Sequence, residues 1–277
     1  MNLKQLHRLV KEQLKLASIE NQNEARVIVE VATGQEFTNL TSDNIVSDEI
    51  VNLTLALVDK RKSGYPLQYI ATTWSFMDFE LSVGPGVLIP RPETETTAKV
   101  AIDCLKNVVN PNVIDLCSGT GAIAIAIRRA YIVQTITALE KYDEAFSYLR
   151  KNSQNYDINI VKADVFGYES LLVDNSLDLI VSNPPYVSKQ EYVTLERELY
   201  FEPKYALSDE ADGLTFYRYI SNAYRSKLKQ QAYLVFEVAS QRANDVKCIL
   251  KSLSYGKIEI ISDEYGMDRV VVAQKMD

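Results

Sequence analysis

The sequence has few of the residues that build metal sites and disulfide frameworks. Its 277 residues include three cysteines and one histidine. The cysteines, Cys104, Cys117 and Cys248, are odd in number and widely spaced, which favours reduced thiols over a disulfide scaffold. Because His7 is the single histidine and no Cys-x-x-Cys pair occurs, the sequence predicts no zinc site.

Long apolar runs are also missing. No stretch approaches the roughly 20 apolar residues that a membrane-spanning helix needs. The first residues, Met1-Asn2-Leu3-Lys4-Gln5, contain no apolar core of a signal peptide. Together with the unpaired cysteines, these absences predict a cytoplasmic protein with no membrane partner.

The sequence lacks an excess of positive charge. Its 30 Lys and Arg residues are outnumbered by 37 Asp and Glu residues, which gives a formal net charge of −7. Phosphate backbones repel such a chain at long range, so we expect no stable nucleic-acid binding. A local basic patch is the alternative that this argument leaves open. Hydrophobic residues make up 47% of the chain, as in an ordinary globular protein.

At ~150 residues per domain, the length predicts about two domains. Over residues 1–73, apolar side chains recur at helical spacing, and Gly34 and Gly64 stand where helices would end. We therefore expect a small N-terminal helical domain over 1–73. Between Trp74 and Val83 apolar and polar residues alternate, and a glycine-proline turn follows, which predicts a β-hairpin linker over 74–92.

After residue 92, short β-rich runs alternate with helical stretches, which is the order of a doubly wound parallel sheet. We expect an α/β domain over 93–277 with a seven-stranded sheet. The candidate strands are 113–116, 135–139, 159–162, 177–181, 232–236, 257–261 and 270–273. The last two have no helix between them, so they should pair antiparallel at one edge of the sheet.

A glycine-containing loop follows the first candidate strand and opens the next helix. Glycines let the backbone pass close to a ligand, and a helix N-terminus favours a negative group such as a carboxylate. A tight turn that binds nothing is the alternative for this segment alone. The loop residues that we assign to a cofactor are Asp115, Cys117, Ser118, Gly119, Thr120 and Gly121.

Acidic residues follow at the ends of the next two strands. Glu140 stands nineteen positions after Gly121, near the ~20-residue spacing at which an acid meets ribose hydroxyls in such sheets. Asp164 could accept from an adenine amino group while Val165 or Phe166 packs on the ring. The alternatives are a solvated strand end for Glu140 and a helix cap for Asp164.

The glycine pattern also bears on the kind of cofactor. Gly119-Thr120-Gly121 lacks the third glycine of the G-x-G-x-x-G fingerprint, which argues against a dinucleotide. S-adenosylmethionine contains adenosine but no pyrophosphate, so it fits this loop better.

The most informative segment is Ser182-Asn183-Pro184-Pro185-Tyr186, at the end of the fourth candidate strand. Ligands of open α/β sheets bind outside the carboxyl ends of the strands. The prolines fix the backbone, so the Asn183 side-chain oxygen and the Pro184 carbonyl become neighbouring acceptors, while Tyr186 offers a flat face. A planar NH2 group could donate one hydrogen to each acceptor. An Asn-Pro turn with a buried tyrosine is the alternative.

This combination resembles the class I S-adenosylmethionine-dependent methyltransferases with an Asn-Pro-Pro-Tyr motif. Among these it is similar to the peptide-chain release factor glutamine N5-methyltransferases. The likeness runs from about residue 65 to the C-terminus. It rests on Pro66-Leu67-Gln68-Tyr69-Ile70, Val87-Leu88-Ile89-Pro90-Arg91-Pro92-Glu93-Thr94-Glu95, Asn183-Pro184-Pro185-Tyr186, Phe201-Glu202-Pro203 with Ala206-Leu207, Asp212-Gly213-Leu214 and Asp268-Arg269-Val270-Val271.

The resemblance implies a Rossmann-like methyltransferase domain and an N-terminal substrate-binding domain. It also implies methyl transfer from S-adenosylmethionine to the glutamine of the Gly-Gly-Gln motif in class 1 release factors. Asn183 would then contact both cofactor and substrate. Arg91 and Glu93 line the substrate entrance or form a solvated face, two interpretations of equal weight. The catalytic and substrate-binding residues would be Asn183, Pro184, Pro185 and Tyr186.

The sequence departs from the family pattern at three places. Cys117 replaces the usual first glycine of the cofactor loop, and Thr72 stands where a glycine commonly follows the Tyr-Ile pair. Glu237-Val238-Ala239 lacks the glycine often found after that glutamate. None of these positions touches the tetrad, so they bear on loop geometry and cofactor affinity more than on the reaction.

Three other functions compete with this one. A related enzyme that methylates a ribosomal-protein glutamine is poorly separated by sequence alone. An N6-adenine DNA or RNA methyltransferase would grip an adenine amino group with the same tetrad, but it needs a basic surface that the net charge of −7 does not favour. A non-catalytic cofactor-binding adaptor has no physical need for the pair of acceptors.

Overall fold

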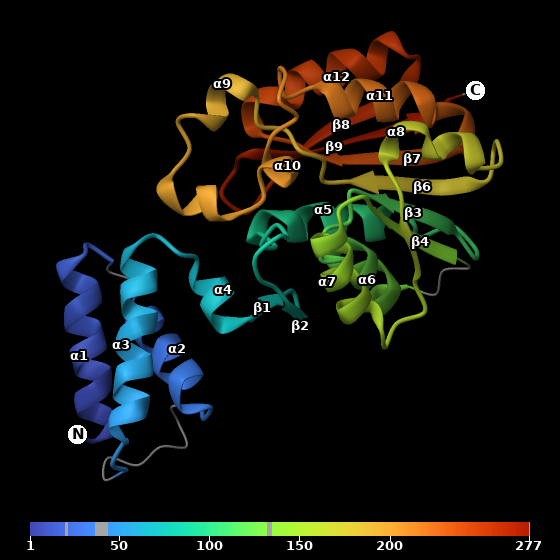
Figure 1. Cartoon of the computed structure of the whole chain (residues 1–277). Coiled ribbons are helices and arrows are strands. Elements are labelled where there is room, and N and C mark those ends of the chain that lie inside the picture. Colours follow the sequence, from blue (N-terminus) through green and yellow to red (C-terminus); the bar gives the residue numbers. More distant parts are fainter. Residues whose placement is uncertain (20–21, 37–43, 132–134, 277) are drawn as a thin grey trace. The chain divides into compact units, whose positions relative to one another are not determined.

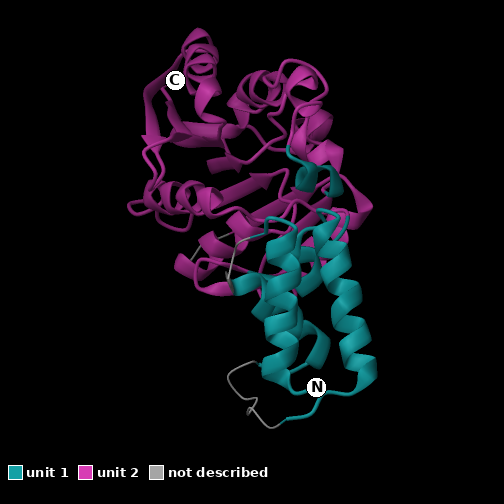
Figure 2. Cartoon of the chain, turned by 90° about the vertical axis from the view of Figure 1, so that its left-hand side faces the viewer, with its two compact units in different colours: residues 1–74, 83–85, 196–201 teal, residues 75–82, 86–195, 202–277 magenta. Residues whose placement is uncertain are grey.

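The computed structural model describes residues 1–19, 22–36, 44–131 and 135–276. The chain forms two compact units, which Figure 2 shows in different colours. The first comprises residues 1–74, 83–85 and 196–201, and the second comprises residues 75–82, 86–195 and 202–277. Among the described helices, none combines the length and the apolar character that crossing a membrane requires.

The first unit is built from helices, as the N-terminal sequence predicts. α1 begins at a capping box formed by Asn2 and Gln5. Its buried face comprises Leu3, Leu6, Val10 and Leu14. Gly34 and Gly64 follow the ends of α2 and α3 with positive φ angles, which is the usual way for a helix to end. The helices are α1 (Leu3–Leu16), α2 (Gln22–Thr33), α3 (Asp48–Lys62) and α4 (Leu67–Ala71).

A buried ion cluster joins distant parts of the sequence within this unit. The Arg61 guanidinium on α3 donates to both carboxylate oxygens of Glu24, at 2.6 and 3.2 Å, and to Glu198 at 2.9 Å. Glu198 belongs to the 3-10 helix η3 (Arg197–Phe201). Because Arg61 and Glu24 are almost fully buried, losing either partner would leave an uncompensated charge in the interior. Segment 196–201 is therefore an integral part of the helical unit.

The expected hairpin is present. β1 (Thr73–Phe76) and β2 (Phe79–Ser82) form a two-stranded sheet, and Met77 in the turn has a φ of 51°. The Asn152 side chain fixes the end of β2, because it accepts from the Ser82 amide at 2.8 Å and donates to the Ser82 carbonyl at 3.1 Å.

A seven-stranded sheet forms the centre of the second unit (Figure 1). The order is β5-β4-β3-β6-β7-β9-β8. β9 runs antiparallel to β7 and to β8, and the other neighbours are parallel. This arrangement confirms the predicted α/β class, the seven strands and the antiparallel pair at one edge. The strands are β3 (Asn112–Leu116), β4 (Thr135–Glu140), β5 (Asn159–Lys162), β6 (Leu177–Ser182), β7 (Leu228–Glu237), β8 (Tyr255–Ser262) and β9 (Asp268–Lys275).

Helices cover both faces of this sheet, so its central strands are apolar on both sides. On β3, Val113 belongs to the apolar cluster on one face and Ile114 to the cluster on the other. The first cluster contains residues of α5 (Pro92–Cys104), α6 (Ala122–Ala130) and α7 (Asp143–Ser153). The second contains residues of α8 (Val165–Tyr168), α11 (Thr215–Ala223) and α12 (Ala243–Ser252). Figure 1 shows these helices on opposite sides of the strands.

The strand order places a ligand site at one end of the sheet. From β3 the chain builds outward to β4 and β5 and then returns to β6, which pairs with the other side of β3. Ligands of doubly wound sheets bind outside the carboxyl ends of the strands at this reversal. Short helices lie in the later connections: η2 (Glu169–Leu171), α9 (Lys189–Tyr192), α10 (Lys204–Leu207), η4 (Arg225–Lys227) and η5 (Ser240–Arg242).

Candidate functional site

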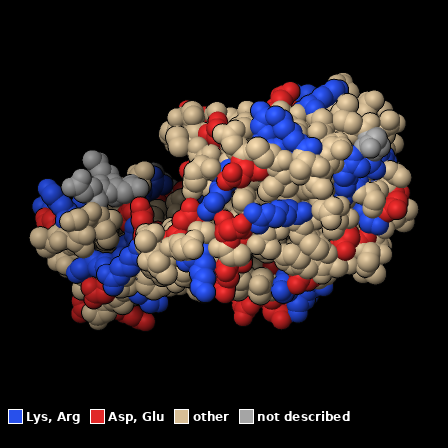
Figure 3. Space-filling view, turned by 90° about the horizontal axis from the view of Figure 1, so that it is seen from above, with Lys and Arg blue, Asp and Glu red and all other residues tan. Residues whose placement is uncertain are grey.

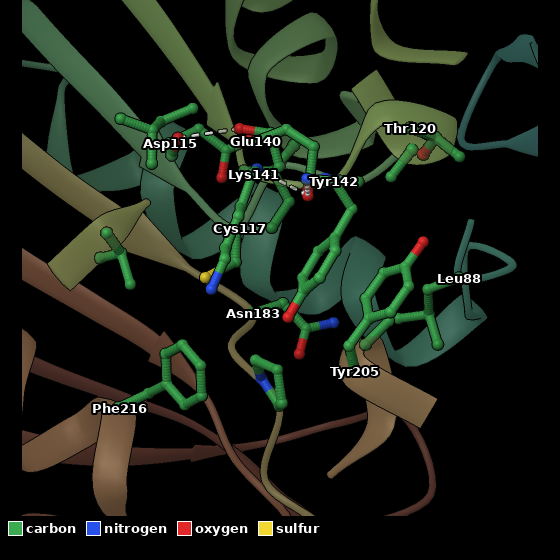
Figure 4. Close-up of a pocket in the computed structure, with 18 of the residues that line it drawn as sticks. Leu88, Asp115, Cys117, Thr120, Glu140, Lys141, Tyr142, Asn183, Tyr205 and Phe216 are labelled. Atoms are coloured by element: carbon green, nitrogen blue, oxygen red, sulfur yellow. Dashed lines mark hydrogen bonds between the residues drawn. The ribbon is translucent and has the colours of Figure 1, made fainter. Parts of the chain in front are cut away.

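A pocket lies in the second unit at the carboxyl ends of β3, β4, β5 and β6 (Figure 4). Every residue that lines it belongs to this unit. The predicted site residues among its lining are Asp115, Cys117, Ser118, Gly119, Thr120, Glu140, Asp164, Val165, Asn183 and Pro185. The sheet therefore brings together side chains that the sequence spreads over 70 positions.

The loop from β3 to α6 forms one wall of the pocket and is held to β4. The Ser118 amide donates to the Leu139 carbonyl at 3.0 Å, and the Gly119 amide donates to the Glu140 carboxylate at 3.0 Å. Gly121 does not line the pocket, but it begins α6 with a φ of 84°. A Cβ atom there would lie 2.7 Å from the Leu149 side chain, which would have to shift, and the positive φ itself favours glycine.

Cys117 adopts a conformation that glycine adopts more easily. Its φ is 61°, in the left-handed region that costs other residues conformational energy. The thiol lines the pocket, and burial raises its pKa well above the ordinary value. The side chain therefore presents a neutral, weakly polar surface, while its backbone keeps the loop geometry that a glycine would give.

Asp115, at the end of β3, is a buried carboxyl group that faces the pocket. Its side chain is about 1% exposed, and neither oxygen meets a donor at hydrogen-bonding geometry within the described part of the chain. Burial raises the pKa of Asp115 to about 7, although the nearby Ser118 hydroxyl and Ala124 amide act in the opposite direction. A buried acid with unused acceptors is suited to a cationic or donor group of a ligand.

Glu140 holds the beginning of α7 as well as the glycine loop. One carboxylate oxygen accepts from the Lys141 and Tyr142 amides at 2.8 and 2.9 Å, and the other accepts from Gly119. Burial raises the pKa of Glu140, and these backbone bonds act against the rise. The second oxygen retains capacity for one further hydrogen bond. Its predicted role toward a ribose stays a prediction.

Asp164 has the helix-cap geometry that was its alternative interpretation, and it also lines the pocket. One oxygen accepts from the Phe166 amide at 3.1 Å at the beginning of α8. The other lies 2.8 Å from the Lys141 ammonium group. The next two residues, Val165 and Phe166, also line the pocket. The cap and the predicted adenine contact are compatible, because each uses different lone pairs of one carboxylate.

The tetrad follows β6 into the pocket. Asn183 and Pro185 line the cavity, whereas Pro184 is buried and Tyr186 packs half-buried against the core beside α11. The Asn183 amide nitrogen donates to the Thr94 hydroxyl at 3.4 Å. Burial raises the pKa of Tyr186, so its hydroxyl keeps its proton at neutral pH. The tetrad thus supplies the Asn183 amide and Pro185 to the cavity, whereas Pro184 and Tyr186 do not line it.

The Asp212-Gly213-Leu214 segment passes directly over the tetrad. A Cβ atom on Gly213 would lie 2.4 Å from the Tyr186 carbonyl oxygen, and the φ of Gly213 is 80°. The Asp209 carboxylate accepts from the Gly213 amide at 2.9 Å and so fixes this turn. A glycine is therefore required here for the close approach of two backbones.

Several lining residues were not identified from the sequence, and an aromatic pair is the most prominent. The rings of Tyr142 and Tyr205 stack with 3.5 Å between centroids and an angle of 16°. The Tyr205 hydroxyl donates to the Gly86 carbonyl at 2.7 Å. Figure 4 shows both rings next to Asn183, with Phe216 on the other side of the cavity. In the sequence, only position could have indicated these residues. Tyr205 lies within the family segment 201–207, and Phe216 lies just after the segment 212–214.

Arg91 and Glu93 lie outside the pocket lining. Arg91 forms an ion pair with the buried Glu202, and the second oxygen of Glu202 accepts from the Ile89 amide at 2.9 Å. These contacts hold the segment with Leu88 and Pro90, which line the pocket, against the segment that carries Tyr205. For Arg91 the structure thus gives a specific partner, and the predicted substrate contacts of Arg91 and Glu93 stay predictions.

Two family models match this chain. Residues 84–231 match the model described as Methyltransferase small domain, and residues 5–71 match the model described as PrmC N-terminal domain. The second model covers most of the helices in the first unit, for which the sequence offered no sharp motif of its own.

Individual relatives agree with these models. The release factor glutamine methyltransferase of Fusobacterium nucleatum is 38% identical over 223 residues, which are 79% of this chain and 62% of that protein. The chain therefore matches less than two thirds of that protein's length. The enzyme of the same name from Thermodesulfovibrio yellowstonii is 32% identical, and the match covers 85% of this chain and 85% of that protein. The one from Bacillus subtilis is 30% identical, and the match covers 91% of each.

A solved structure supports the fold. The catalytic domain of hMettl16, in complex with the MAT2A 3'UTR hairpin 6, has a TM-score of 0.57 and 17% sequence identity. The match covers 71% of this chain and 76% of that chain. At this identity the likeness concerns the fold alone.

Proposed function

Because the chain belongs to the family of release factor glutamine methyltransferases, we propose that it transfers a methyl group from S-adenosylmethionine to a release factor glutamine. The acceptor is the N5 amide nitrogen in the Gly-Gly-Gln motif of class 1 release factors. The observation that carries the proposal is a single pocket that contains the acids Asp115 and Glu140 and the amide of Asn183. The substrate places the reaction in the cytoplasm, where release factors act.

The described residues fit S-adenosylmethionine. Its amino group is a cation, and Asp115 offers two buried carboxylate oxygens with unused acceptor capacity. Glu140 would accept from a ribose hydroxyl, and Asp164 with Phe166 would hold the adenine. When bound, this cofactor supplies an electrophilic methyl group on a sulfonium sulfur.

The tetrad prepares the glutamine for transfer. An amide nitrogen is a weak nucleophile because its lone pair is delocalised into the carbonyl group. The Asn183 side-chain oxygen and the Pro184 carbonyl accept hydrogen bonds from its two N–H groups and hold the nitrogen for in-line attack. The same acceptors stabilise the positive charge that develops on this nitrogen. No strong base need act before transfer.

Two other acceptors offer a similar planar NH2 group. An adenine in nucleic acid is disfavoured by the net charge of −7, and on the face shown in Figure 3 acidic side chains are interspersed with basic ones. A ribosomal-protein glutamine has the same chemistry as the proposed substrate. The matched relatives are named for release factors, which favours the release factor glutamine over the ribosomal-protein glutamine.

The test is a transfer assay with labelled S-adenosylmethionine. Unmodified release factor, ribosomes, DNA and RNA are offered in parallel, and peptide mass spectrometry locates the added methyl group. We expect one methyl group on the Gly-Gly-Gln glutamine and none after Asn183→Ala within the same time. Label in ribosomal protein or nucleic acid would replace the proposed substrate, and cofactor binding without any transfer would favour a non-catalytic module.

A further inference from the structure

The Asn152 side chain, on α7, is hydrogen-bonded to backbone groups of two distant segments. Its oxygen accepts from the Ser82 amide at 2.8 Å, and its nitrogen donates to the Ser82 carbonyl at 3.1 Å. The same nitrogen donates to the Thr120 carbonyl at 3.0 Å. A side-chain amide nitrogen has two hydrogens, so both are used. Asn152 therefore joins the end of the hairpin to the loop between β3 and α6, across 70 and 32 positions of the sequence.

These partners permit one orientation of the Asn152 amide group. If its oxygen and nitrogen exchanged places, the NH2 group would face the Ser82 N–H and the oxygen would face two carbonyl groups. Three hydrogen bonds would then become three repulsive contacts. Because all three contacts agree on one orientation, the half-buried amide can hold the backbone groups that it touches in fixed positions.

Thr120 connects this contact to the pocket. It is buried and lines the cavity (Figure 4), and the next residue, Gly121, begins α6. Ser118 and Gly119 hold the first half of the loop to β4. Asn152 holds the second half from α7, so the loop is fixed on both sides. The first amides of α6 have no partner within the helix, and a shift of the Thr120 carbonyl would move them as well.

The hairpin is a firm support for the Asn152 contact. Leu81, next to Ser82, is about 1% exposed. At the other end of the hairpin, the Met77 amide donates to the Glu95 carboxylate on α5 at 2.8 Å. The position of the hairpin is therefore transmitted to the loop at the pocket by one side chain.

We propose that Asn152 is a positioning residue that fixes the cofactor loop to the end of the hairpin and so forms the pocket before S-adenosylmethionine binds. Without Asn152, the Thr120 carbonyl and the beginning of α6 would become ordered only on binding, which costs affinity. Asn152 does not line the pocket, so it acts through Thr120. The inference rests on the proposed function for its ligand but is independent of the methyl acceptor.

The first test compares two neighbouring residues of α7 in the full-length protein. Asn152→Ala removes three hydrogen bonds, and we expect the cofactor Kd to rise about tenfold while kcat at saturating substrates changes less than threefold. Ser153→Ala is the matched control, because it loses the hydrogen bond from its hydroxyl to the Leu149 carbonyl, at 2.7 Å, without reaching the loop. It should lower the free energy of unfolding and leave Kd unchanged. An unchanged Kd in Asn152→Ala, or an equal rise in Ser153→Ala, would overturn the inference.

A variant of the same shape tests the two hydrogen bonds that Asn152 donates. Asn152→Asp still accepts from the Ser82 amide but directs an oxygen at the Ser82 and Thr120 carbonyls. Titration calorimetry should therefore give a higher cofactor Kd than in Asn152→Ala. A Kd equal to that of the wild type would show that the donated bonds do not position the loop.

The hairpin can be loosened separately. Leu81→Ala removes a buried side chain next to Ser82, and we expect it to raise the cofactor Kd about threefold in the wild type but no further in Asn152→Ala. Urea unfolding verifies that each variant is folded under the conditions of the assay. An unchanged Kd in Leu81→Ala, or fully multiplicative effects in the double variant, would mean that the hairpin does not act through Asn152.

A readout without ligand separates this inference from the proposed function. The backbone amide resonances of Gly119 and Gly121 in ligand-free ¹⁵N-labelled protein should shift or broaden in Asn152→Ala and Asn152→Asp and stay in place in Ser153→Ala. Unchanged resonances in both Asn152 variants would overturn the positioning role. If the wild type binds no S-adenosylmethionine, the proposed function fails, while these resonances still decide whether Asn152 holds the loop.

Discussion

The carboxyl ends of β3 and β7 each bury one acid, but the two acids have different neighbours. Asp115 faces the pocket, and no described donor meets its oxygens at hydrogen-bonding geometry. Glu237 lies outside the pocket lining, and one of its carboxylate oxygens accepts from the Thr97 hydroxyl of α5 at 3.2 Å. Burial raises the pKa of both groups to about 7. The two buried acids therefore differ in their surroundings, since Asp115 is open to a ligand and Glu237 already accepts a hydrogen bond from a side chain of the protein.

The largest expected effect separates the residue proposed to act in the reaction, Asn183, from the buried acid proposed to bind the cofactor, Asp115. Asn183→Ala removes one electrostatic contact with the transition state, so we expect kcat to fall by about 10²–10³ while the cofactor Kd changes less. Steady-state kinetics with release factor and calorimetry with the cofactor measure the two quantities. Asn222→Ala, at an exposed position of α11, is the control. An unchanged kcat would remove Asn183 from the proposed mechanism.

The opposite pattern is expected on the cofactor side. Asp115→Asn keeps the size of the side chain but removes the charge, so we expect the cofactor Kd to rise by about 10- to 100-fold, the scale of one hydrogen bond to a charged group. Titration calorimetry measures it, with the exposed Asp245→Asn as control. If Asp115→Asn lowers kcat and leaves the cofactor Kd unchanged, the assignment of Asp115 to cofactor binding is wrong.

The raised pKa of Asp115 also predicts a pH dependence of stability. The folded protein binds this proton more tightly than the unfolded chain, because the pKa rises from 3.8 to about 7 on burial. The stabilising contribution is thus complete below about pH 4 and is lost as the pH rises through about 7. Between pH 8 and pH 5, the free energy of unfolding should rise by roughly 2 kcal/mol more in the wild type than in Asp115→Asn. Urea unfolding at both pH values tests this, and parallel profiles would contradict it.

A smaller effect is expected at the aromatic wall of the pocket. Tyr205→Phe keeps the stack on Tyr142 but loses the hydrogen bond to the Gly86 carbonyl, worth about 1 kcal/mol. Cofactor release in stopped-flow experiments should be about fivefold faster, and faster still in Tyr205→Ala, which also loses the stack. Tyr265→Phe, at an exposed position outside the pocket, should release the cofactor at the wild-type rate. A wild-type rate in Tyr205→Ala would exclude the stack from cofactor retention.

The smallest predicted change concerns Cys117. Replacing it by glycine relieves the positive φ but adds freedom to the unfolded chain, so the net gain in stability should be below about 1 kcal/mol. Gln231→Gly, at another positive φ on an exposed part of β7, should give a similar gain. Chemical denaturation measures both. A loss of stability in Cys117→Gly alone would show that contacts of the thiol outweigh the backbone strain.

Local sequence patterns were sufficient for the strands and the ends of β3, β4 and β6, because a buried strand and the residue after it are neighbours in the chain. Asn183 and Glu140 could be placed at the site in this way. The contacts that complete the site join distant positions, as the bond from Tyr205 to Gly86 does across 119 residues. They depend on how α5 and α10 pack, and no period or spacing in one sequence encodes that packing.

Arg91 shows the same limit for a charged residue. Its segment was correctly selected as informative, but sequence alone gave equal weight to a substrate contact and a solvated face. The structure adds an ion pair with the buried Glu202, which neither interpretation contained. A charge in a motif has several possible partners, and only tertiary packing determines which one it meets.

The ion cluster of Arg61, Glu24 and Glu198 has a consequence for the history of the gene. Glu198 of the helical unit comes from the second half of the chain. An insertion or recombination that transferred only residues 1–74 would therefore carry an incomplete folding unit. Such a fragment would retain Arg61 with one of its two carboxylate partners. The two halves are thus expected to be inherited together, and a chimera between relatives should exchange segment 196–201 along with the N-terminal helices.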